Sequence, residues 1–201
     1  MRDGAFIVSI AAACLVAFGL FFPYFYLQLY GLDKALNADL AFYAIAILNA
    51  GSIVGRLLPN SFADRVGSYN LIVPCLLATS VLLFTMLSVH TSAGLVVFGL
   101  LYGCMSGSYL SLIPSIIAQL SKNSGQPGLR MGFAFTNVGF CMLLGTPIEG
   151  ALLHGTSARG FVWTRTVIFS GVMVLSGAIG MLVSRFLHVR AQGSGTPRQL
   201  V

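Results

Sequence analysis

The amino-acid sequence predicts an all-α membrane protein with six transmembrane helices. Of its 201 residues, 57% are hydrophobic and only 8% are charged, and the mean hydropathy is +0.89. Soluble domains carry about 25% charged residues. The apolar residues are also gathered into stretches of roughly 20 residues, the length that crosses the hydrocarbon core of a bilayer. We therefore expect a multi-pass protein that is surrounded by lipid.

Six apolar stretches are long enough to cross the bilayer, and short connections separate them. The first is longer than the roughly 7–15 apolar residues of a signal peptide, so we expect it to be retained as a helix. One transmembrane domain is predicted over residues 1–187, followed by a polar, disordered cytoplasmic tail at 188–201. The spans are expected at about 5–28, 39–59, 69–89, 93–119, 130–153 and 162–187.

The Lys and Arg residues set the expected orientation, because membrane proteins place most of them on the cytoplasmic side. With the N-terminus inside, the outer segments hold only Lys34, Arg159 and Arg165. We therefore expect both termini in the cytoplasm, in the plasma membrane rather than an organelle membrane. The tyrosines of the first stretch and Trp163 would then form an aromatic belt near the outer interface. The cytoplasmic segments hold Arg2, Arg56, Arg65, Lys122, Arg130, Arg185, Arg190 and Arg198.

Several functional classes find no support in the sequence. The net charge of +6 comes without a basic run interleaved with aromatic residues, so we expect no nucleic-acid partner. No nucleophile, metalloprotease or phosphate-loop motif is present, and we expect neither an enzyme nor a cofactor or metal site. The cysteines fall in four different apolar stretches and are expected to be small buried residues rather than disulfides: Cys14, Cys75, Cys104 and Cys141.

The second stretch carries the most informative polar residues. Asn49, Ser52 and Arg56 are spaced at i, i+3 and i+7, which predicts that a helix presents them on one face. An arginine in an apolar helix needs a partner, a water-filled cavity or a place at the cytoplasmic edge, because a buried charge in the bilayer is costly. Asp64, Arg65 and Gly67 are expected to form a charged turn after this helix.

Small residues recur at four-residue spacing in three stretches. This pattern is typical of helices that pack closely in membranes, and packing alone explains it. The sets are Gly51 and Gly55, then Gly99, Gly103 and Gly107, then Ser176, Gly180 and Ser184.

Polar residues also lie on the other side of the fourth stretch and in the fifth. Tyr102, Ser106 and Tyr109 share one helical face that is costly in hydrocarbon, so they are candidates to line a polar cavity, together with Asn137. Pro114 is expected to break or kink the fourth helix. Pro23 lies in the outer third of the first stretch.

Glu149 is the only acidic residue well inside an apolar stretch. Two alternatives are open. It is an ion or proton site, or it faces the outer vestibule.

At these residues the chain resembles the C-terminal half of a major facilitator superfamily transporter, and is most similar to the monocarboxylate-transporter-like permeases of fungi. The acid-base-x-Gly turn at Asp64, Arg65 and Gly67 resembles the superfamily's gating loop. The likeness rests on Gly19-Leu-Phe-Phe-Pro-Tyr-Phe-Tyr26, Ala46-Ile-Leu-Asn-Ala-Gly-Ser-Ile-Val-Gly-Arg56, Gly107-Ser-Tyr-Leu-Ser-Leu-Ile-Pro114, Arg130-Met-Gly132 and Gly145-Thr-Pro-Ile-Glu-Gly-Ala-Leu152.

The resemblance implies one half of a twelve-helix fold, with a substrate site between two six-helix halves. It implies transport of a small organic solute, such as a monocarboxylate, by alternating access. Arg56 would then bind a carboxylate, or act in gating as the alternative role, and Asn49, Ser52, Tyr102, Ser106, Tyr109 and Asn137 would complete the substrate site.

The acid transporters of animals in this superfamily carry an acidic residue at the position of Ser52, one turn before the arginine. The resemblance therefore does not imply a pair between a carboxylate and Arg56 in this chain. A missing N-terminal half, or a second copy of the chain, is the expected partner. The alternative reading is a truncated membrane protein that does not transport, or an interaction subunit of a full-length carrier.

Overall fold

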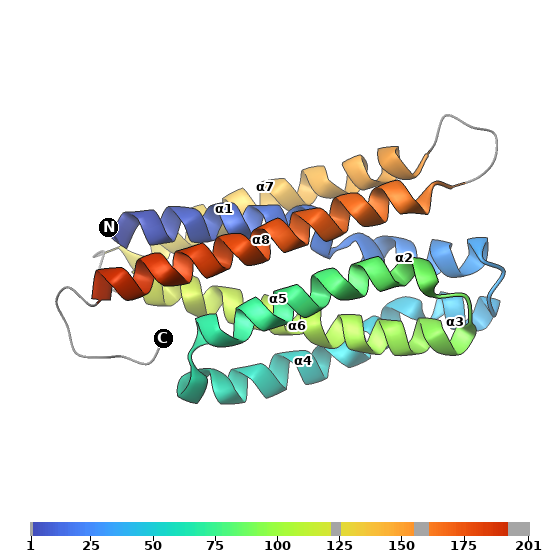
Figure 1. The fold of residues 1–201 in the computed structure, drawn as a ribbon, viewed down its shortest axis with the longest axis horizontal. Helices are drawn as coiled ribbons and strands as arrows, with labels where there is room; N and C mark the ends of the chain where they lie inside the picture. Colours follow the sequence, from blue (N-terminus) through green and yellow to red (C-terminus); the bar gives the residue numbers. More distant parts are fainter. Residues whose placement is uncertain (1, 122–125, 155–160, 193–201) are drawn as a thin grey trace.

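The computed structural model describes residues 2–121, 126–154 and 161–192, and within these ranges all regular structure is helical. The helices run back and forth along the long axis of an elongated bundle (Figure 1). Two ends can be distinguished. The N-terminus lies at one, and α3 (Ala38–Phe42) lies at the other, which we call the α3 end.

The first predicted span consists of two helices, α1 (Arg2–Leu20) and α2 (Phe22–Asp33), which are separated at Phe21. Pro23 lies in the first turn of α2, where its missing N–H group costs little. The break frees the carbonyl of Leu20, and this oxygen accepts a 2.6 Å hydrogen bond from the hydroxyl of Tyr102. The span is therefore formed by two helices in sequence, and together they cover Gly4–Asp33.

The second span begins at a capped helix and ends later than predicted. The side chain of Asn37 accepts hydrogen bonds from the N–H groups of Asp39 and Leu40 at 3.0 and 3.2 Å, which caps α3. α4 (Ala44–Val66) then continues through Pro59 to Gly67, whose φ of 94° suits glycine.

The predicted charged turn is therefore helical over most of its length, because α4 is stopped by Gly67 and not by Pro59. Arg65 lies in the last turn of α4, where a basic residue favours the helix dipole. Asp64 belongs to the same turn, but its side chain lies outside the described part. Gly67 itself lies between α4 and α5, outside either helix.

The remaining spans are α5 (Ser68–Thr85) with the short helix η1 (Met86–Ser88), α6 (Ser92–Ser121), α7 (Pro127–Leu153) and α8 (Trp163–Gln192). α6 passes through Pro114 without ending, so the predicted break there is wrong. α8 extends five residues beyond 187, so the tail does not begin at 188. The rest of the predicted tail, 193–201, lies outside the described residues.

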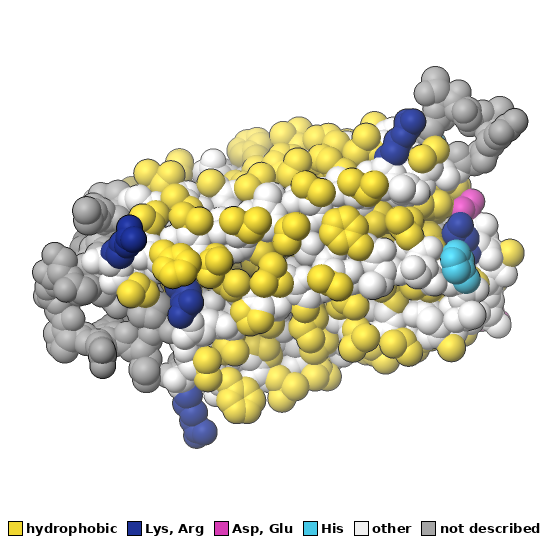
Figure 2. All heavy atoms as spheres, in the orientation of Figure 1, with side chains coloured by type: hydrophobic (Ala, Val, Ile, Leu, Met, Phe, Trp, Pro, Cys, Tyr) yellow, Lys and Arg dark blue, Asp and Glu magenta, His cyan; other side chains and the backbone are white. Residues whose placement is uncertain are grey.

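The bundle has the surface of a membrane protein. Within the described ranges, five helices are long and apolar enough to cross a bilayer, with α1 and α2 counted as one. α4, which corresponds to the second predicted span, has 23 residues and is not among these five, because Asn49 and Arg56 make it less apolar. On the face shown in Figure 2, hydrophobic side chains cover the length of the bundle and charged side chains gather at its two ends.

Glycines bring α4 and α6 into backbone contact. A β-carbon on Gly55 would overlap the carbonyl oxygen of Cys104, and one on Gly103 would overlap that of Leu48. On Gly107 it would lie 2.7 Å from the carbonyl oxygen of Ser52. Such distances leave no room for a side chain, so the packing role predicted for these glycines is confirmed.

α1 and α8 form the second close pair. A β-carbon on Gly180 would lie 2.8 Å from the β-carbon of Ala12. Three buried hydroxyls meet between α1, α5 and α8, and their oxygen atoms are 2.6 Å apart for Ser9 and Ser184, 3.1 Å for Ser9 and Tyr69, and 3.2 Å for Tyr69 and Ser184. Ser184 donates its proton to the carbonyl of Ala5, so the protons of Ser9 and Tyr69 serve the contacts within the group. We call these three residues the hydroxyl triangle. It lies near the end opposite α3.

The aromatic residues of the α3 end pack inward. Trp163 and Tyr30 are buried, with ring centroids 4.9 Å apart in an edge-to-face arrangement. The indole N–H of Trp163 donates a 2.7 Å hydrogen bond to Asp33, and the hydroxyl of Tyr30 donates to the carbonyl of Val89 at 3.1 Å. The polar atoms of Trp163 and Tyr30 thus find partners within the protein, while Tyr24 and Tyr26 are half-buried, and the aromatic belt stays a prediction.

Candidate functional site

The polar residues predicted on α4 do not all share one surface. Asn49 and Arg56 are exposed, and the guanidinium of Arg56 makes no ion pair with any side chain that the structure describes. Ser52 is buried against Gly107 of α6, and its hydroxyl donates a 2.9 Å hydrogen bond to the carbonyl of Asn49. The surface available to a solute on this helix is thus formed by Asn49 and Arg56.

Asn137 lies on α7, away from the α4 residues. α4 and α7 are on opposite sides of the bundle (Figure 1). The amide of Asn137 donates to the carbonyl of Phe133 one turn earlier, at 2.7 Å. Within this chain the structure does not bring Asn137 together with Asn49 and Arg56.

The polar face of α6 is directed at the broken first segment. Tyr102 and Ser106 are fully buried. The hydroxyl of Ser106 donates to the carbonyl of Tyr102 at 2.7 Å and lies 3.0 Å from that of Tyr24. Because one hydroxyl has one proton, Tyr24 is the donor to Ser106. These side chains stabilise the break at Phe21 and are not open to solvent.

Tyr109 continues the same face of α6 toward the opposite end. Its ring is buried, and its hydroxyl oxygen has no hydrogen-bond partner among the described residues. A buried, unpaired hydroxyl is costly, so this atom has the capacity to bind a water or a polar group of a solute. Of the predicted site residues, Tyr109 alone has a free hydrogen-bonding atom of this kind within the described ranges.

A second polar group surrounds Glu149, and the sequence did not reveal its partners. Glu149 is 1% exposed, and Ser170 of α8 donates a 3.0 Å hydrogen bond to its carboxyl group. The hydroxyl of Tyr26 on α2 donates to the carbonyl of Thr146 at 3.3 Å. Glu149 therefore faces into the bundle, and the alternative of an outer vestibule is wrong. Ser170 gave no signal in the sequence, because its role depends on how α8 packs on α7.

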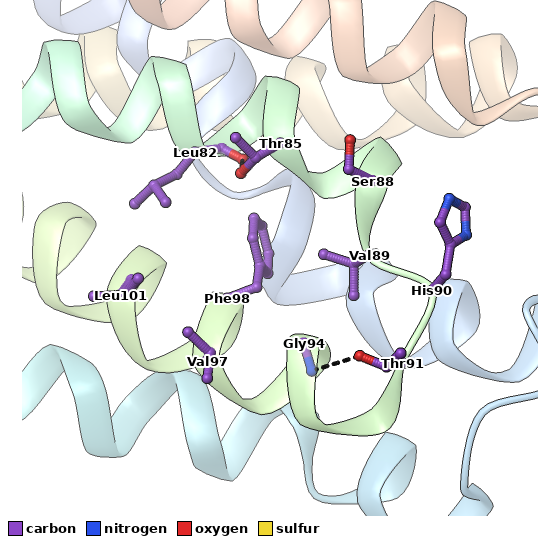
Figure 3. A pocket seen from close by; sticks show the side chains of 10 residues that line it. All are labelled: Leu82, Thr85, Ser88, Val89, His90, Thr91, Gly94, Val97, Phe98 and Leu101. Atoms are coloured by element: carbon purple, nitrogen blue, oxygen red, sulfur yellow. Dashed lines mark hydrogen bonds between the residues drawn. The ribbon is translucent and has the colours of Figure 1, made fainter.

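A cavity of about 280 Å³ lies at the α3 end between α5, η1 and α6 (Figure 3). The side chains of Val89 and Phe98 lie between η1 and α6, and the N–H of Gly94 donates to the hydroxyl of Thr91 at 3.1 Å. None of the predicted substrate residues lines this cavity. The lining residues are Leu82, Thr85, Ser88, Val89, His90, Thr91, Gly94, Val97, Phe98 and Leu101.

The four cysteines are free thiols in this structure, and each is half-buried within a helix. Although they are far apart in the sequence, Cys14 on α1 lies beside Cys141 on α7.

The chain is similar in sequence to proteins named as transporters or efflux proteins. The chain is 32% identical over 190 residues to the aspyridones efflux protein apdF of Emericella nidulans, which covers 94% of this chain and 38% of that protein. It is 39% identical over 170 residues to the MFS-type transporter dbaD of the same organism, which covers 84% and 38%. The agnestins efflux protein AgnL12 of Paecilomyces divaricatus is 34% identical over 171 residues, with 85% and 38% covered.

These matches also define which part of such a protein the chain represents. It spans about two fifths of the length of the curated relatives it matches. No family model matches the sequence. The helical bundle and the relatives together lead to one assignment: the chain belongs to the major facilitator superfamily and corresponds to one six-helix half of its twelve-helix fold.

Proposed function

We propose that the chain forms half of a secondary transporter that moves a small organic solute across a membrane by alternating access. This proposal rests on one observation: over 84–94% of its length, the chain is similar to proteins named as transporters or efflux proteins. Two of them are named for efflux, so export is the direction we propose. These names favour transport over a protein that only interacts with a carrier.

For the substrate we propose a metabolite that carries a carboxylate. Arg56 supports this choice, because its exposed guanidinium offers a planar pair of donors that fits a carboxylate. Asn49 is exposed on the same helix and would bind a second polar group of the solute. Asn137 would act from α7, across a site shared with the partner half.

We also propose that α4 and α7 contact a second six-helix unit, either an N-terminal half or another copy of this chain. In the most apolar 18-residue stretch of α7, only 11% of the stretch is buried within the bundle. The corresponding stretch of α1 and α2 is 61% buried. Phe133, Phe140 and Leu143 are all exposed on α7, and α4 exposes Leu57 and Leu58. Both helices also expose polar residues, Asn49 and Arg56 on α4 and Thr136 on α7, which are costly against lipid and would be covered by another protein unit.

A chimera tests the transport proposal. The matching 190-residue segment of apdF would be replaced by this chain, and aspyridone export would be measured in cells together with uptake of labelled monocarboxylates. We expect transport of at least one of these solutes above that of cells lacking the protein. A chimera that reaches the membrane in the amount of apdF itself and moves none of them would contradict the proposal.

The partner proposal predicts the behaviour of the isolated chain. Purified in mild detergent, the 201-residue chain is expected to form a pair or to aggregate, because its α4 and α7 faces lack their partner. Light scattering of the protein component gives the mass. A stable monomer that catalyses uptake of labelled monocarboxylates after reconstitution would show that six helices supply both sides of the site.

A further inference from the structure

Glu149 is a buried acid that the proposed substrate site does not use. It is the only glutamate in the chain and is 1% exposed. It lies four residues before the end of α7, about 6 Å along the helix axis from Leu153. The carboxyl group is therefore close to the α3 end and yet shielded from solvent.

The groups around Glu149 are neutral on every helix that packs against α7. α8 contributes Ser170, whose hydroxyl donates to Oε1 at 3.0 Å. α2 contributes Tyr26, and α6 contributes Tyr102, whose hydroxyl proton is given to Leu20. α1 contributes the backbone of Phe18, against which Gly145 packs.

No Lys, Arg or His side chain in the described part of the chain bonds to Glu149. Arg165, on the same helix as Ser170, is exposed and lies more than one turn closer to the α3 end. A carboxylate buried with one hydroxyl donor and no cation carries a large desolvation cost, whereas a carboxylic acid carries little. We propose that Glu149 is a proton-binding site, which holds a proton while α7 packs against α2 and α8.

The break in the first segment gives this proton a route to water. Tyr26 covers the site from α2, because its hydroxyl bonds to the carbonyl of Thr146 and would lie 2.8 Å from a β-carbon on Gly150. α2 is joined to α1 only through Phe21. When α2 swings away from α7, water reaches the carboxyl group, which releases its proton to that water and becomes a carboxylate.

Proton binding at Glu149 stands independently of transport, whereas its use to drive a solute rests on the proposed function. Release of the proton leaves a negative charge that opposes the return of α2 and α8. Rebinding a proton allows the helices to close. The site would thereby link closure of the α3 end to the movement of one proton.

Infrared spectroscopy tests the site without any transport assay. The full chain, labelled with ¹³C-glutamate, would be studied in lipid nanodiscs at neutral and alkaline pH. We expect a protonated-carboxyl band at neutral pH that shifts with the label, disappears at alkaline pH and is absent from Glu149→Gln. The band should persist in Asp39→Asn, which changes an exposed acid. If the labelled residue shows only carboxylate bands at neutral pH, the proposal is overturned. This outcome can be observed in the unmodified chain, without any substitution.

Exchange into D₂O tests the part played by α2. Tyr26→Phe removes the hydrogen bond to Thr146 and keeps the ring, so we expect the carboxyl band to exchange severalfold faster than in the unmodified chain. Tyr43→Phe, which changes an exposed tyrosine outside α2, is the matched control and should exchange at the original rate. Equal rates in Tyr26→Phe and the unmodified chain would exclude α2 as the cover. If the chimera fails to transport while the band behaves as expected, the proposed function fails and the proton site remains.

Discussion

Gly55→Leu is expected to separate α4 from α6 and to destabilise the folded chain strongly. A β-carbon at this position already overlaps the carbonyl oxygen of Cys104, which belongs to a helix backbone and cannot rotate away. Overpacking a core side chain costs about 1–3 kcal/mol, and a clash with backbone should reach at least the upper end of that range. Thermal unfolding in detergent, followed by size-exclusion chromatography of the soluble fraction, measures the loss.

The chain offers a matched control for this substitution. Gly139 is also a glycine within a long helix, α7, but no atom lies within 4 Å of the position of its β-carbon. Gly139→Leu should therefore leave the unfolding temperature of the isolated chain nearly unchanged. An equal loss in the two variants would mean that helix propensity, and not the contact between α4 and α6, sets the stability.

Arg56→Lys is expected to lower transport by the chimera about tenfold or more, the equivalent of losing one charge-assisted hydrogen bond. Lysine keeps the positive charge but lacks the planar pair of donors. Initial rates of solute transport at several concentrations would show whether the apparent affinity falls.

Arg190→Lys is the control for an exposed arginine at a helix end, because Arg190 lies in the last turn of α8 and belongs to neither the proposed substrate site nor the gating loop. It should transport at the rate of the unmodified chimera. If Arg56→Lys does so too, Arg56 acts through its charge alone, as a gating or anchoring residue. In that event the carboxylate proposed for the substrate loses its main support.

The spans were predictable because hydropathy is summed over about 20 residues, so that single polar side chains do not hide the signal. The break at Phe21 was not. Proline alone does not identify a break, since the helices continue through Pro59, Pro74, Pro114 and Pro147. What distinguishes the first segment is a partner on another helix, Tyr102, that satisfies the freed carbonyl.

The limits of periodicity are clearest on α4 and α6. Ser52 is about 60° around the helix from Asn49, which is enough to turn it toward α6 while Asn49 stays exposed. Tyr102 and Ser106 do share a face, as predicted, but the neighbour of that face is the first segment and not a cavity. Periodicity shows which residues point together, and only tertiary packing shows what they meet.

The hydroxyl triangle and the break at Phe21 lie toward opposite ends of the bundle, and their mechanical properties differ. Ser9, Tyr69 and Ser184 join three helices through a shared set of hydrogen bonds. At the α3 end, movement of α2 about Phe21 would have to break two hydrogen bonds, from Trp163 to Asp33 and from Tyr30 to Val89. We therefore expect the end with the hydroxyl triangle to move only with the whole half, and the α3 end to open only when these two bonds are broken.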